Sequence, residues 1–203
     1  MRHLLLNDIA EMNSRYRATF INSLSGFKSL NLVGTVSETG VNNLAPFNSI
    51  VHIGANPPCL GMIARPATEE HQTLANIKAN KQYTLNAVND SIFEQAHQCS
   101  AKYTADQSEF TETGLPLFYS EKLKAPYVAS SNIKIGLELI EIIPIHFNQT
   151  SLIIGKIIEI ILPESIIEED GFVNIAKAGS ITCNGLDSYY KVSPLKRIPY
   201  AKP

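Results

Sequence analysis

Residues 32–77 read LVGTVSETGVNNLAPFNSIVHIGANPPCLGMIARPATEEHQTLANI, and this stretch decides the fold. Apolar and β-branched residues on both sides of the Thr39-Gly40 turn predict a hairpin with strands at about 30–37 and 43–53. Prolines 57 and 58 end the second strand, and residues 59–64 predict a third. A loop then leads into a helix that extends to about Asn80. The stretch therefore combines several strands with polar and proline positions at which a ligand can meet the backbone.

Pro46 interrupts the second predicted strand. A proline inside a strand indicates either a bulge or an edge at which no ladder hydrogen bond is needed. The residues alone leave two interpretations open: a strand breaker beside a solvated Asn48-Ser49 face, or a free edge that serves a ligand.

The flanking sequence predicts one domain in three parts. An amphipathic N-terminal helix is expected at about 7–28, a barrel core at about 30–162 and a C-terminal extension at about 163–203. Residues 133–145 and 151–162 alternate as two long antiparallel strands, in which Gly136 and Gly155 suggest the bends of a small barrel. The predicted fold class is mainly β, a β-barrel with inserted helices.

Composition narrows the function. Of 203 residues, 44% are hydrophobic and 18% charged, and the net charge of −2 offers no footprint for nucleic acid or anionic lipid. Because no secretory leader or membrane span is apparent, we expect a cytoplasmic protein with no nucleic-acid or membrane partner. The three separated cysteines predict buried thiols in a reducing compartment and no metal site.

Familiar catalytic patterns are missing. The sequence contains no Ser-His-Asp order, P-loop, paired-carboxylate signature or G-x-G-x-x-G motif. His52, His97 and His146 are most simply structural, which leaves His71 as a candidate site histidine. No side chain is therefore predicted to be catalytic in itself.

The order of these signals resembles the flavin reductase-like family of FMN-binding split-barrel proteins, over about residues 30–190. The segments that carry the resemblance are 40–49 (GVNNLAPFNS), Pro57-Pro58, Arg65-Pro66, 73–77 (TLANI), Glu109-Phe110 before Gly114-Leu115, and 187–190 (DSYY).

The resemblance implies FMN bound across the strands, commonly at a homodimer interface. The residues that it assigns to the cofactor are Asn43, Pro46, Phe47, Asn48 and Ser49 near the isoalloxazine, Ala64, Arg65 and Pro66 along the ribityl chain, and His71, Gln72 and Thr73 at the phosphate. The physical interpretation agrees, because a helix start at Thr73 offers free N–H groups and a positive dipole end, with Arg65 as a counter-charge.

Some positions depart from the family or allow a second interpretation. Asn48 stands where relatives often have serine, and Glu69-Glu70 lie close to the expected phosphate, so we expect these carboxylates to face solvent. Arg65 could instead pair with one of them. Tyr103, Tyr189 and Tyr190 fit a flavin contact or, more safely, an interface.

The resemblance implies an NAD(P)H-dependent flavin reductase, in which NADH or NADPH delivers hydride to flavin N5. An FMN-binding electron carrier or flavin store without efficient turnover is the alternative, because one fold can host several functions. A barrel that has lost its cofactor is the third, if Glu69-Glu70 face the phosphate.

Overall fold

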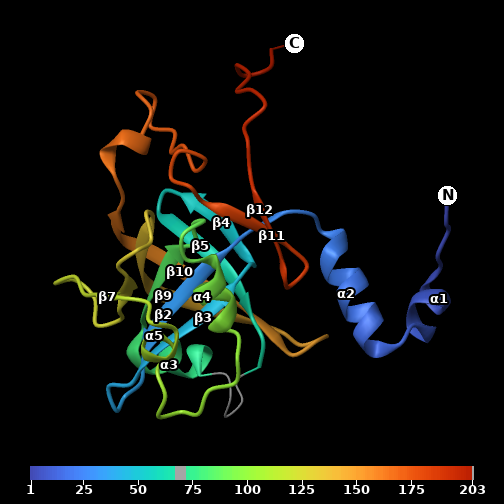
Figure 1. Cartoon of the computed structure of the whole chain (residues 1–203), viewed down its shortest axis with the longest axis horizontal. Coiled ribbons are helices and arrows are strands. Elements are labelled where there is room, and N and C mark those ends of the chain that lie inside the picture. Colours follow the sequence, from blue (N-terminus) through green and yellow to red (C-terminus); the bar gives the residue numbers. More distant parts are fainter. Residues whose placement is uncertain (67–71, 203) are drawn as a thin grey trace.

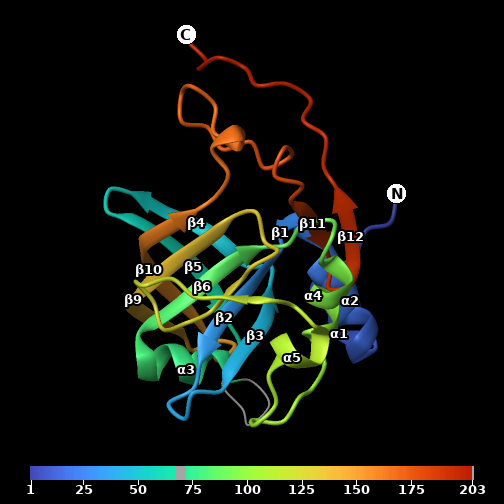
Figure 2. The ribbon, with the colours of Figure 1, turned by 60° about the vertical axis from the view of Figure 1, so that its left-hand side comes forward.

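The computed structural model describes residues 1–66 and 72–202, and a curved antiparallel sheet forms its centre (Figures 1 and 2). Within these residues the seven strands of the sheet are, in spatial order, β3 (Asn42–Phe47), β2 (Asn31–Val36), β6 (Gln82–Ala87), β9 (Lys134–Ile145), β10 (Thr150–Ile161), β5 (Pro58–Ala64) and β4 (Ile50–Ala55). Strands β3 and β4 are the two edges, although they follow each other in the chain. The mainly β class predicted from the sequence is confirmed.

Smaller elements surround this sheet. The helices are α1 (Leu6–Glu11), α2 (Ser14–Leu24), α3 (Thr73–Asn80), α4 (Phe93–Gln98), α5 (Glu109–Thr113) and the 3-10 helix η1 (Glu164–Ile166). The remaining strands are β1 (Lys28–Ser29), β11 (Ile181–Asn184) and β12 (Ser188–Lys191), which form one small sheet, and β7 (Leu117–Phe118) and β8 (Tyr127–Val128), which form another. Helix α3 packs on β2, while α4 and α5 pack on β3. None of the helices in the described ranges is long and apolar enough to cross a membrane.

Two apolar clusters hold the fold together. One fills the inside of the curved sheet, with Val33, Met62, Ile77, Tyr83 and Ile153 all nearly inaccessible to solvent. The other joins β2 and β3 to α4, α5 and β11 on the opposite side. Because this second cluster anchors the C-terminal strand β11 beside β3, residues from both ends of the chain meet at one edge of the sheet.

The long hairpin of β9 and β10 matches the prediction, and its two glycines lie at irregularities. The register shifts between Ile154 and Gly155, and again between Ile157 and Glu159, which lies opposite Gly136. A Cβ at Gly155 would collide with the hydroxyl of Tyr83, and one at Gly136 with Tyr127 and Leu123. These glycines therefore give buried tyrosines room while bulges curve the sheet.

Two element predictions were wrong. The single N-terminal helix is two helices, because Met12 is extended and the side chain of Asn13 caps a new start by accepting a hydrogen bond from the Arg15 N–H (3.0 Å). The single strand at 43–53 is two edge strands, β3 and β4, which are separated at Asn48-Ser49. The chain thus leaves one edge of the sheet at Phe47 and joins the other at Ile50.

Candidate functional site

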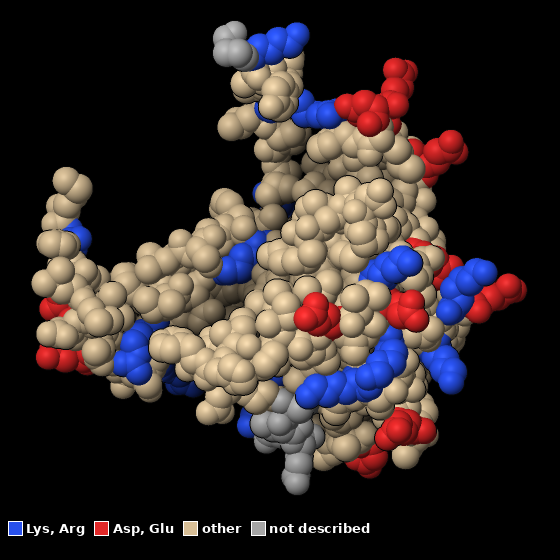
Figure 3. All heavy atoms as spheres, turned by 180° about the vertical axis from the view of Figure 1, so that it is seen from behind, with Lys and Arg blue, Asp and Glu red and all other residues tan. Residues whose placement is uncertain are grey.

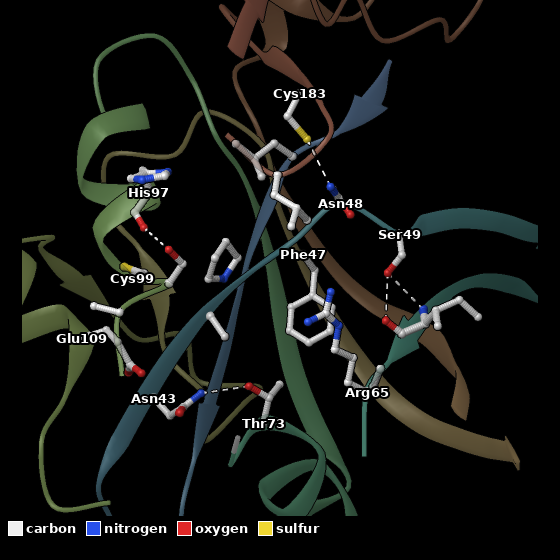
Figure 4. Close-up of a pocket in the computed structure, with 18 of the residues that line it drawn as sticks. Asn43, Phe47, Asn48, Ser49, Arg65, Thr73, His97, Cys99, Glu109 and Cys183 are labelled. Atoms are coloured by element: carbon white, nitrogen blue, oxygen red, sulfur yellow. Dashed lines mark hydrogen bonds between the residues drawn. The ribbon is translucent and has the colours of Figure 1, made fainter. Parts of the chain in front are cut away.

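A cavity of about 510 Å³ lies beside β3, where segments from several parts of the chain converge. Its lining comes from β3 and the link to β4, from the end of β5, from the start of α3, and from a second wall made by α4, α5 and the β11–β12 turn. The volume falls within the range of roughly 300–1,000 Å³ usual for small-molecule and cofactor sites. Figure 4 shows labelled side chains from each of these segments facing this space.

Nine of the eleven residues predicted for the cofactor line this cavity. They are Asn43, Pro46, Phe47, Asn48, Ser49, Ala64, Arg65, Gln72 and Thr73. Pro66 is not among the lining residues, and His71 lies outside the described residues. Glu69-Glu70, and any ion pair that they form with Arg65, lie outside them too.

The edge position of β3 explains Pro46. The Leu44 N–H points away from β2 and donates to the carboxylate of Glu109 (Oε2, 2.8 Å). Alternation places residue 46 on the same free side, where proline has no N–H to satisfy. The strand pairing therefore shows that Pro46 lies on a free edge, and this edge faces the cavity; a ligand at this edge stays a prediction.

A buried polar network fixes the end of the cavity at α3. The Asn43 side-chain amide donates to the hydroxyls of Thr35 and Thr73 (3.2 Å each), and that of Asn76 donates to Thr35 (3.1 Å). Thr73 is the first residue of α3, so this network holds the helix start against β2 and β3. The first N–H groups of a helix lack intrahelical acceptors. Gln72, at the N-cap, supplies no side-chain cap within the described part of the chain.

The Asn48-Ser49 link is tied to its surroundings on both sides. The Ser49 hydroxyl donates to the Ile63 carbonyl (2.9 Å) and accepts from the Ile63 N–H (3.2 Å), which attaches the link to β5. The Asn48 amide donates to the Gly185 carbonyl (3.0 Å) and to Cys183 Sγ (3.5 Å). Asn48 therefore fastens the β11–β12 turn beside the cavity.

A second wall faces these residues, and the sequence interpretation assigned none of it to the cofactor, although Tyr189 was one of three tyrosines that fit a flavin contact or an interface. His97 lines the cavity, and its Nδ1 lies 2.6 Å from the Tyr189 hydroxyl, with the two rings 5.8 Å apart in an edge-on arrangement. Tyr189 follows Leu186 and Asp187, which also line the cavity. His97 lies on α4 and Tyr189 on β12, and packing of β12 against α4, seen in the contact of Tyr189 with Phe93, brings them together.

Two ionisable groups of the second wall are influenced by burial. Burial raises the pKa of the Glu109 carboxyl above its ordinary value, because desolvation outweighs the hydrogen bond from Leu44. Burial likewise raises the pKa of the Cys99 thiol to about 12. A raised pKa disfavours the thiolate, which is the nucleophilic form of cysteine.

Comparison with known proteins fits this geometry. A family model described as "Flavin reductase like domain" matches residues 24–176, so the chain belongs to the flavin reductase-like family. A protein from Shewanella frigidimarina NCIMB 400, whose crystal structure is assigned as a flavin reductase with a split barrel domain, is 42% identical. It covers 99% of this chain and 100% of its own, with a TM-score of 0.95. The predicted split barrel is thereby confirmed.

More distant structures share the fold. Nitrilotriacetate monooxygenase component B from Bacillus cereus is 21% identical, covers 98% of both chains and has a TM-score of 0.85. An FMN-binding protein from Thermus thermophilus is 15% identical, covers 87% of this chain and 93% of its own, and has a TM-score of 0.71. Family membership assigns the chain a flavin-related function, and these two structures show the shared fold.

Proposed function

We propose that the protein binds FMN non-covalently as a homodimer and catalyses NAD(P)H-dependent flavin reduction, with hydride passing from a reduced nicotinamide to flavin N5. One observation carries the proposal: in a chain of the flavin reductase-like family, residues 43, 45–49, 64, 65, 72 and 73 line the same cavity. In such a protein the cofactor supplies the redox chemistry, and the protein supplies binding, orientation and electrostatics.

The two ends of the cavity suit the two ends of FMN. At one end, the start of α3, for which the described residues provide no side-chain cap, offers backbone N–H groups and the positive end of the helix dipole. Arg65 adds a guanidinium, and together these groups suit a phosphate. At the other, Phe47, Ala45 and Ile63 offer apolar surface for a ring system, and the Asn48 carbonyl oxygen offers an acceptor.

Flavin content tests the proposal directly. We expect purified protein to release FMN on denaturation, or the protein without flavin to quench FMN fluorescence on titration. An absence of both would overturn the proposal. Stopped-flow mixing of the FMN complex with NADH and NADPH tests turnover, and bleaching too slow for catalysis would identify an electron carrier instead.

The phosphate end has its own test. Gln72→Glu keeps the side-chain volume but places a carboxylate at the cavity, so we expect at least a tenfold weaker affinity for FMN and little change for riboflavin, which has no phosphate. Thr73→Glu should act in the same direction, but Thr73 is buried, so its fold must be checked. Ala79→Glu, exposed near the far end of α3, is the matched control. Equal affinities in Gln72→Glu and Ala79→Glu would contradict the phosphate assignment.

A further inference from the structure

The N-terminal helices form an arm (residues 1–27) that stands away from the body of the molecule (Figure 1). Neither α1 nor α2 contains a buried residue. Yet Tyr16, Phe20 and Leu24 recur at four-residue steps on α2 and form an apolar stripe, with the rings of Tyr16 and Phe20 stacked 6.2 Å apart. An 11-residue helix is marginal in water without packing against such a stripe.

Apolar side chains occupy part of the outer face of the main sheet, with Glu141 beside them opposite Ile154. Met62 and Ile153 point into the core, so alternation turns their neighbours on β5 and β10 outward. The apolar side chains of this face, which we call the outer patch, are Val51, Ile53, Ile63, Ile143, Leu152 and Ile154. A Cβ at Gly61 would touch both Ile53 and Leu152, so these two side chains cover the glycine. One face of an antiparallel sheet is normally solvated and polar, and this one resembles a surface that becomes covered.

A groove joins the two apolar surfaces. Phe27 and Asn22 at the base of the arm line it on one side, and Val51 and Ile63 of the outer patch line it on the other. Figure 3 shows the hollow between arm and body, in which uncharged residues predominate. The groove and the cofactor cavity share Asn48, Ser49 and Ile63, so whatever fills the groove also borders the proposed flavin site.

The position of the arm relative to the body agrees with that in a related crystal structure. The Shewanella frigidimarina crystal structure superposes on 99% of this chain with a TM-score of 0.95. Residues 1–27 are about an eighth of the 203-residue chain, so a differently placed arm would be incompatible with that score. An arm without buried residues holds the same position in a crystal of a relative, which indicates that something outside the chain supports it.

We infer that α2 of each copy lies across the outer patch of a second copy, so that the two chains exchange arms about a two-fold axis. This inference rests on the homodimer of the proposed function and names its interface. The arm and the outer patch belong to the same chain and are both apolar, so reciprocal contacts close a two-fold dimer and leave neither surface exposed.

The area is sufficient for a stable dimer. Tyr16, Leu24, Phe27, Val51, Ile53 and Ile143 are each between 39% and 63% exposed. At roughly 150–250 Å² for a large side chain, they offer on the order of 500 Å² of apolar surface per copy. A standard interface buries about 800 Å² per partner, of which about 60% is apolar. The apolar area offered by these side chains therefore matches the apolar area of a standard interface.

Charge substitutions on the two surfaces test the exchange. We expect the wild type to have twice the chain mass by light scattering, and Leu24→Lys on α2 and Ile53→Lys on the outer patch each to weaken dimerisation at least tenfold. Both residues are exposed, so circular dichroism should confirm an intact fold. Ile175→Lys, similarly exposed but away from both surfaces, is the matched control and should remain dimeric.

Mixing the two variants distinguishes exchange from other dimers. A mixed dimer pairs the intact α2 of the Ile53→Lys chain with the intact outer patch of the Leu24→Lys chain and so recovers one complete contact. We therefore expect the mixture to dimerise more tightly than either variant alone. A monomeric wild type, or a mixture no tighter than its components, would overturn the inference. Flavin content measured in parallel separates this result from the proposed function, because a monomer that binds FMN refutes only the exchange.

Discussion

Glu109 brings a half-buried carboxyl group to the cavity wall, and its ionisation should weaken the fold. Its pKa is raised in the folded protein, chiefly by desolvation, so the folded state binds more protons than the unfolded state above the ordinary glutamate value. The free energy of unfolding therefore falls as the pH rises from the ordinary glutamate pKa to the raised pKa of folded Glu109. Glu109→Gln cannot ionise and keeps an oxygen for the Leu44 N–H. We expect the stability of the variant relative to the wild type to increase as the pH rises through this range, as measured by urea unfolding of flavin-free protein.

Glu112→Gln is the matched control for this measurement. Glu112 lies on the same helix, α5, but is exposed. Its substitution should leave the pH dependence of the wild type unchanged. If the difference in unfolding free energy between Glu109→Gln and the wild type were constant with pH, the Glu109 carboxyl would not have a raised pKa in the folded protein.

Single residues also show what a sequence can reveal about a site. Asn43, Phe47 and Thr73 were predictable, because they lie in short segments whose order is typical of the family. His97, Glu109 and Tyr189 also line the cavity, but their common location depends on tertiary contacts between α4, α5, β3 and β12. No local spacing encodes these contacts. The sequence interpretation therefore predicted one wall of the cavity and, in the opposite wall, named only Tyr189, with a flavin contact and an interface both left open.

At the scale of elements, the bulge in β10 depends on Gly155. A side chain there would collide with the hydroxyl of Tyr83, which is nearly fully buried and has no room to move. Overpacking of this kind typically costs about 1–3 kcal/mol. We expect Gly155→Ala to lower the free energy of unfolding by about that amount, as measured by chemical denaturation.

Gly54→Ala in β4 is the matched control, because a Cβ there would meet only the Pro57 carbonyl oxygen at an ordinary 3.5 Å. Its effect should remain within about 0.5 kcal/mol. Tyr83→Phe removes the colliding oxygen, so the double variant Gly155→Ala/Tyr83→Phe should recover part of the lost stability. An equal cost for the two glycine substitutions would contradict the collision.

Some elements could be predicted from local sequence patterns, and others depend on contacts between distant residues. The β9–β10 hairpin was predictable because long alternating runs flank a turn. The separation of β3 from β4 was not, because Asn48-Ser49 continues an extended pattern and only the contacts to Gly185 and Ile63 show that the chain changes edges there. The break between α1 and α2 was hidden in the same way, since Asn13 acts as a cap within an otherwise continuous helical periodicity.

For the whole molecule, a ligand that binds only the folded state raises its stability in proportion to its affinity, so flavins report on the site through the unfolding of the entire chain. FMN at 100 times its Kd should add about 2.7 kcal/mol, which for a chain of this size corresponds to a rise in Tm of about 5–10 °C. Riboflavin at the same concentration should give a clearly smaller rise, because it lacks the phosphate that the start of α3 is proposed to bind.

Gln72→Glu should reduce the rise in Tm with FMN toward the riboflavin value, while Ala79→Glu should preserve it. Both are measured by scanning calorimetry at fixed protein concentration. Equal rises in Tm for the two flavins would show that the phosphate does not bind at the start of α3. No rise with either flavin would contradict the flavin site itself. The two outcomes therefore distinguish a wrong orientation of the cofactor from a wrong function.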